Sequence, residues 1–89
     1  MRELGATYVL AGRYQDACRE LAAYIERRPY DPEGLFYYGQ ALEELGRVVE
    51  APEMFERAIE AARTAPRYRR RLTGKWSRLA QKRLRKLGS

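Results

Sequence analysis

Apolar residues recur at intervals of three and four along most of this chain, which is the spacing of one face of an α-helix. Between residues 13 and 28 they fall at Tyr14, Ala17, Leu21, Tyr24 and Ile25. The same spacing predicts further helices over residues 2–11, 32–45, 49–63 and 66–87. The sequence therefore predicts an all-α protein of about five helices.

Glycine and proline mark the ends of these predicted helices. Gly12 and Gly46 follow two of them, and glycine readily takes the left-handed backbone that ends a helix. Asp31 stands before Pro32, a pair that suits the cap and the first position of a helix. Pro66 stands 34 residues after Pro32 and is expected to open the fifth helix in the same way.

A shift of 34 residues lays the first half of the chain on the second. Gly5 falls on Gly39, Gly12 on Gly46, Ala17 on Ala51 and Leu21 on Phe55. This period, the glycine positions and the alternation of large and small residues resemble the tetratricopeptide repeat. The second copy carries the pattern at Leu35, Tyr38, Gly39, Leu42, Gly46, Ala51, Phe55 and Ala58, whereas in the first copy Tyr24 stands where the family prefers Ala.

The resemblance implies a right-handed superhelical stack of antiparallel helix hairpins, an α–α solenoid. We expect a single domain over residues 1–89, with one repeat at about 1–31, a second at about 32–65 and a basic capping helix at about 66–87. Tyr68, Leu72, Trp76 and Leu79 are predicted to form the face on which that last helix docks. Because Met1 already falls inside the first helix of the repeat, we expect the chain to be cut from a longer protein.

The net charge of +6 is distributed very unevenly. Residues 1–66 carry 8 Lys and Arg against 12 Asp and Glu, and the remaining residues carry 10 basic and no acidic side chains. On the last helix Lys75, Arg78, Lys82 and Arg85 line the side opposite the predicted docking face. This basic face predicts a contact with an anionic partner or surface.

Catalytic chemistry is poorly represented. The chain has no His, no Asn and no glycine-rich phosphate loop, so we expect no catalytic residue, no metal and no cofactor. Glu53, Glu56 and Glu60 fit a solvated helix face better than a cation site. Cys18 is the only cysteine, which excludes an intramolecular disulfide and favours a reducing, cytoplasmic location.

The resemblance further implies that a protein or peptide partner lies along the concave surface formed by the first helix of each hairpin. The matching positions include Arg2 and Val9 and, as the main candidates, Glu33, Phe36, Gln40, Glu43, Arg67, Arg70 and Arg71. Phe36 faces away from the apolar stripe, so it is either an exposed anchor for a partner or a residue covered by the fifth helix. The three arginines suit an acidic peptide.

Two other interactions stay open at this point. In the alternative function, the basic last helix contacts nucleic acid or an anionic membrane surface. A homodimer is also predicted, because Leu4 and Tyr8 lack a preceding repeat to cover them, and a two-fold contact between copies would do so.

Overall fold

The computed structural model describes residues 2–88, and this part of the chain is helical and contains no strand. The helices are α1 (Arg2–Leu10), α2 (Tyr14–Arg27), α3 (Pro32–Glu44), α4 (Glu50–Arg63) and α5 (Arg70–Leu87), with a 3₁₀ turn, η1 (Arg67–Arg69), before α5. The first four helices begin and end within one residue of the predicted positions. The all-α fold is therefore confirmed.

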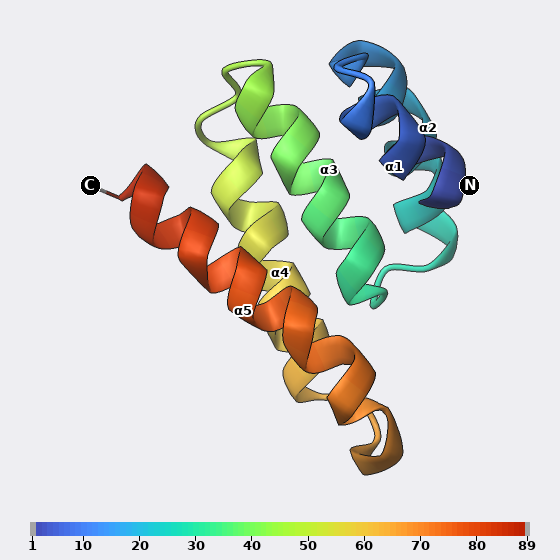
Figure 1. Ribbon diagram of the computed structural model, residues 1–89, viewed down its shortest axis with the longest axis vertical. Coiled ribbons are helices and arrows are strands. Elements are labelled where there is room, and N and C mark those ends of the chain that lie inside the picture. The colour runs from blue at the N-terminus through green and yellow to red at the C-terminus, as the bar shows by residue number, and fades with distance from the viewer. Residues whose placement is uncertain (1, 89) are drawn as a thin grey trace.

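The helices form two hairpins, α1–α2 and α3–α4, followed by the single helix α5 (Figure 1). α3 packs against both helices of the first hairpin, and α5 packs against both helices of the second. This succession of layers is the helical stack that the repeat predicted. Within residues 2–88, no helix combines the length and the apolarity that a membrane span requires.

The turns follow the punctuation of the sequence. Gly12 and Gly46 have φ values of +76° and +78°, a left-handed conformation that closes α1 and α3. At the start of α3, Asp31 Oδ1 accepts a hydrogen bond of 3.2 Å from the backbone N–H of Glu33, and Pro32 occupies the first turn. Asp31 thus caps α3 as predicted.

In each hairpin, one glycine faces one large side chain of the paired helix. A Cβ at position 5 would lie 2.4 Å from Cγ of Leu21, and a Cβ at position 39 would lie 2.9 Å from Cε1 of Phe55. Leu21 and Phe55 are fully buried. The absence of a side chain at the two glycines therefore lets the paired helices approach until these residues fill the space between them.

The bulky Tyr24 of the first repeat is accommodated by another glycine. A Cβ at position 34 would lie 2.7 Å from Cε2 of Tyr24. The tyrosine ring therefore lies directly on the first turn of α3, next to the cap at Asp31. This contact joins the end of α2 to the start of α3.

The docking face predicted for the last helix is wrong at its beginning. Tyr68 is 83% exposed and Leu72 is 73% exposed, whereas Trp76 and Leu79 pack against the core. The apolar stripe continues instead through Ala80, Leu84 and Leu87. Tyr68 lies in the 3₁₀ turn, which has about three residues per turn and does not share the helical phase of α5.

Arg83 lies on this apolar stripe without being left as an isolated charge. Its Nη1 is 3.4 Å from Oε2 of Glu43 on α3. On either side of this ion pair, α5 stays packed against the core up to Leu87.

We predict opposite effects on stability for two glycine-to-alanine changes. Gly39→Ala should lower the free energy of unfolding by about 1–2 kcal/mol, because the new Cβ overlaps the buried Phe55 ring. Gly74→Ala should raise it by about 0.5–1 kcal/mol, because alanine is the better helix former. The nearest atom to a Cβ at position 74 is the flexible Arg78 Nη1, at 3.4 Å.

Urea unfolding followed by far-UV circular dichroism measures both variants. In thermal unfolding, a change of 1 kcal/mol in the free energy of unfolding corresponds to a shift of roughly 4–8 °C in Tm for a chain of this size. An equal stabilisation by both changes would contradict the proposed packing role of Gly39.

Candidate partner-binding site

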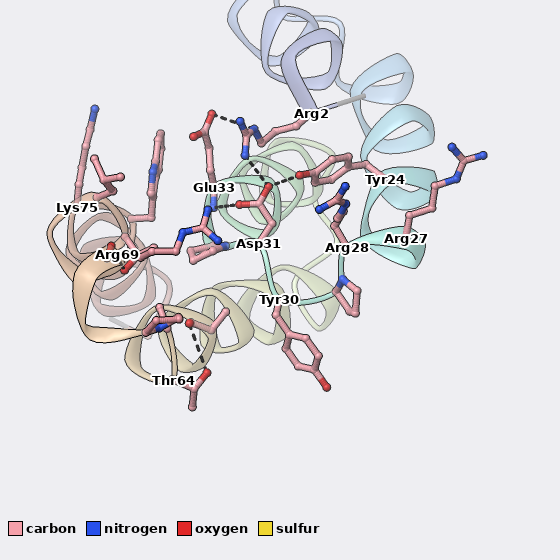
Figure 2. Close-up of a pocket in the computed structure, with 18 residues that line it drawn as sticks. Arg2, Tyr24, Arg27, Arg28, Tyr30, Asp31, Glu33, Thr64, Arg69 and Lys75 are labelled. Carbon is pink, nitrogen blue, oxygen red and sulfur yellow. Dashed lines mark hydrogen bonds and ion pairs between the residues drawn. The ribbon is translucent and has the colours of Figure 1, made fainter.

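Among the described residues, an open cleft of about 950 Å³ lies between the α2–α3 connection and the α4–α5 connection. We call it the inter-repeat cleft. One wall is formed by the end of α2, the other by the first turns of α5, and the starts of α1 and α3 lie between them (Figure 2). Its size is at the upper end of the range of about 300–1,000 Å³ typical of ligand pockets.

A network of polar side chains around Asp31 lies in the middle of the cleft (Figure 2). Asp31 Oδ2 accepts hydrogen bonds from Nη1 of Arg2, at 2.8 Å, and from the hydroxyl of Tyr24. Arg2 Nε also lies 3.5 Å from Oε2 of Glu33. The two carboxylates therefore share one guanidinium, and helices α1, α2 and α3 meet at these side chains.

The network shifts the protonation of two of its members. The hydrogen bond to Asp31 raises the pKa of the Arg2 guanidinium beyond its usual value, so Arg2 remains a cation. Burial, followed by the hydrogen bond to Asp31, raises the pKa of the Tyr24 hydroxyl to about 12. Tyr24 thus remains a neutral hydrogen-bond donor well above neutral pH.

Four further cations border the cleft: Arg27 and Arg28 from the end of α2, and Arg69 and Lys75 from the η1–α5 segment. In Figure 2, Arg69 extends toward the Asp31 network from one side, and Arg28 lies on the other side. Neither side chain forms an ion pair or a hydrogen bond with another residue in the part of the chain described. They leave guanidinium groups open for an acidic ligand.

Two large apolar side chains also line the cleft and remain in contact with solvent. Tyr30 is 80% exposed and Leu72 is 73% exposed. Each offers surface that a partner could cover.

The predicted concave-surface residues do not all gather in this cleft. Glu33 lines it, as does Lys75 from the predicted basic face, but Gln40 and Glu43 lie half-buried farther along α3. Glu43 Oε1 is buried without a hydrogen-bond partner among residues 2–88, while Oε2 pairs with Arg83.

The three predicted arginines at the start of the last helix lie outside the lining. Arg67, Arg70 and Arg71 are all exposed around the 3₁₀ turn. Arg70 Nε donates a hydrogen bond of 3.4 Å to the carbonyl oxygen of Ala65. They border the α4–α5 connection, where Arg69 alone among these neighbours faces the cleft.

The exposed-anchor hypothesis for Phe36 is wrong. Phe36 is only 6% exposed, and its ring centroid lies 5.6 Å from that of Trp76, 5.7 Å from Phe55 and 5.8 Å from Tyr37. Helix α5 covers it through Trp76, whose ring packs on that of Phe36. Val9 is also buried, so neither residue is available to a partner.

The basic face of α5 is presented to solvent. Lys75, Arg78, Lys82 and Arg85 are all exposed, and Lys75 Nζ lies 5.0 Å from the centre of the Trp76 ring. The face forms a continuous row away from the packed stripe of the helix.

The outer side of α1 is less apolar than the dimer prediction requires. Leu4 is exposed, but Tyr8 is half-buried and the guanidinium of Arg13 lies 4.8 Å from the centre of its ring. The homodimer remains a prediction, with Leu4 as its main exposed contact.

Metal-binding groups do not converge among residues 2–88. In this part of the chain no three Cys, Asp or Glu side chains come close enough to hold a metal ion. Cys18 is half-buried, and burial raises the pKa of its thiol, which disfavours the reactive thiolate.

Reasoning from the sequence missed the residues that line the cleft most openly: Arg28, Tyr30, Arg69 and Leu72. Arg28 and Tyr30 lie in the connection between α2 and α3, Arg69 lies in the 3₁₀ turn after Pro66, and Leu72 lies in the first turn of α5. The sequence signal that could have identified this region is a charged residue and an aromatic residue next to each of Pro32 and Pro66, which are 34 residues apart.

Comparisons with known proteins agree with this architecture. A family model described as tetratricopeptide repeat matches residues 3–66, which span both hairpins. No curated protein and no solved structure shows significant similarity to the chain.

We predict that Tyr24→Phe reduces the sensitivity of the fold to alkaline pH. The unfolded tyrosine has a pKa of about 10, whereas the native one has a pKa of about 12. The native state therefore holds this proton more tightly, and the resulting stability is complete below pH 10 and is lost as the pH rises through about 12. Phenylalanine has no such proton.

Urea unfolding at steps between about pH 8 and pH 12 tests this. The advantage of the wild type over Tyr24→Phe should shrink across the upper half of this range. Tyr37 and Tyr38, whose pKa values burial also raises, will keep some pH dependence in the variant. A constant difference at all pH values would exclude the role given to Tyr24.

Proposed function

Because this chain belongs to the tetratricopeptide repeat family, we propose that it is a protein-interaction module that holds a segment of its partner in the inter-repeat cleft. Repeats of this family generally act as scaffolds for protein–protein interaction and not as catalysts. The observation that carries the proposal is the cleft itself, which combines open guanidinium groups with exposed apolar side chains. Both are features of surfaces that bind partners.

The cleft is also built on rigid elements. Glu33 and Arg2 come from the first helices of the two hairpins and are held by the Asp31 network, and Trp76 is held by its packing on Phe36. A partner segment would therefore meet a largely preformed surface, and little ordering of the protein would oppose binding. Gln40, farther along α3, could extend the contact.

Leu72→Ser tests this proposal. We expect peptides selected from a random display library on the wild-type protein to lose affinity roughly 10- to 100-fold on this variant. That loss corresponds to the roughly 1.5–3 kcal/mol gained when a leucine side chain is fully buried. Isothermal titration calorimetry with the selected peptides measures it.

Leu10→Ser is the matched control. Leu10 is 81% exposed, close to the value for Leu72, but it ends α1 at the opposite end from the cleft. It should leave peptide affinity unchanged. Equal losses in both variants, or no enrichment of peptides above an unrelated protein, would refute binding in the cleft.

A second candidate function is supported by the exposed basic face of α5. Residues 67–89 contain ten basic and no acidic side chains, so this helix could bind nucleic acid or an anionic membrane. Sequence information is read by base contacts, whereas a basic row offers mainly phosphate contacts. Any such binding should be indifferent to sequence.

For duplex DNA we expect weak binding at low salt that is nearly absent at physiological ionic strength. The logarithm of the binding constant should fall with the logarithm of the salt concentration, at a slope of about −0.9 per phosphate neutralised. Changing Lys75, Arg78, Lys82 and Arg85 together to Glu should remove it. Fluorescence anisotropy with labelled DNA at several salt concentrations provides the measurement.

Two double variants that change the net charge by the same amount distinguish a local contact with DNA from a general effect of net charge. Arg78→Glu with Lys82→Glu should weaken DNA binding strongly, and Arg27→Glu with Arg28→Glu, at the C-terminal end of α2, should weaken it little. If DNA binding were tight and sequence-selective at physiological salt, α5 would be the functional site and the hairpins its scaffold.

A further inference from the structure

We propose that the inter-repeat cleft recognises a linear acidic peptide in which carboxylates stand on both sides of an apolar side chain. This inference rests on the proposed function and names the chemical class of the partner. It follows from the charges of the cleft, which are negative in the middle and positive on both walls, and from its exposed apolar side chains.

The carboxylates in the middle of the cleft already have partners within the protein. Asp31 accepts hydrogen bonds from Arg2, Tyr24 and the backbone N–H of Glu33. Glu33 in turn lies in an ion pair with Arg2. A ligand therefore finds no free cation at the centre, and a negative group placed there would be repelled by the two carboxylates.

The open cations lie at the two sides. Arg28 comes from the end of α2, and Arg69 comes from the 3₁₀ turn before α5, so they stand on opposite walls (Figure 2). Each presents a planar fork of N–H donors that matches the two oxygens of a carboxylate. Lys75 adds a third positive charge on the α5 wall.

The apolar surface of the cleft supplies the remaining contact. Tyr30 and Leu72 belong to opposite walls and are both largely exposed, and Pro66 adds a further nonpolar lining residue. An apolar side chain of the ligand would cover this surface while its acidic neighbours reach the two arginines. The ligand pattern is therefore acidic, apolar, acidic.

This pattern favours a peptide over nucleic acid. A nucleic-acid backbone carries evenly spaced phosphates and would bring a negative charge against Asp31 and Glu33. The uninterrupted row on α5, formed by Lys75, Arg78, Lys82 and Arg85, suits such a polyanion better. The molecule thus presents two basic surfaces with different charge patterns, and the cleft is the one suited to a peptide.

The probe for this inference is a short fluorescein-labelled peptide with two aspartates on each side of a central leucine. We expect saturable binding to the full chain in fluorescence anisotropy. Replacing the aspartates by asparagine, or the leucine by serine, should each weaken binding at least about tenfold. Equal binding of the asparagine peptide would overturn the recognition of carboxylates, and absence of binding by the parent peptide would overturn the inference as a whole.

The decisive comparison uses two double variants that change the net charge equally. Arg28→Glu with Arg69→Glu should weaken the peptide more than about tenfold, because both carboxylate contacts are reversed. Arg78→Glu with Lys82→Glu, on the outer face of α5, should change affinity less than about threefold. Similar losses in both pairs would show general charge attraction and overturn the inference.

Two further measurements complete the test. Arg28→Gln with Arg69→Gln removes the charges without reversing them and should give a smaller loss in the same direction, and circular dichroism verifies that each variant is folded. Single-stranded DNA should not displace the peptide at physiological salt; displacement that depends on Arg28 and Arg69 would make nucleic acid the occupant. If library-selected peptides depend on Leu72 but the acidic probe does not bind, this inference fails while the proposed function stands.

Discussion

The close approach of paired helices at Gly5 and Gly39 is the contact on which the rest of the structure depends. Each glycine faces a fully buried large residue, Leu21 or Phe55, at a distance that no side chain could share. Because Phe55 fills the hairpin at Gly39, its ring also supplies the surface on which Phe36 packs. Trp76 packs on Phe36, so the packing of Phe55 against Gly39 inside the second hairpin determines where α5 can dock.

This dependence explains which parts of the fold were predictable from the sequence. Glycines at a period of 34 residues, opposite Leu21 and Phe55, specify helix pairs through local geometry, and the proline-flanked cap at Asp31 specifies a boundary. The phase of α5 was not predictable in the same way. A 3₁₀ turn at residues 67–69 shifts Tyr68 off the helical wheel, and apolar spacing alone does not reveal a change from 3.6 to about three residues per turn.

The candidate site was predictable only in part for a related reason. Glu33 belongs to the repeat pattern and was identified, but Arg28 and Arg69 come from connections that the repeat pattern does not constrain. Phe36 failed as an anchor because its exposure depends on α5, a long-range partner that helical periodicity does not place. Side chains in loops thus acquire their roles from the packing of helices that are distant in sequence.

The Asp31 network separates the groups that hold the cleft together from the groups that would face a ligand in the proposed function. Asp31 both caps α3 and binds Arg2 and Tyr24, so its carboxylate is committed to joining three helices. Arg28 and Arg69 make no such bonds within residues 2–88. Because exposed charges contribute little to the free energy of folding, we expect that Arg28 and Arg69 can be substituted without loss of the fold. If the cleft binds a partner as proposed, substitutions at Arg28 and Arg69 could change the partner while the helical stack stays intact.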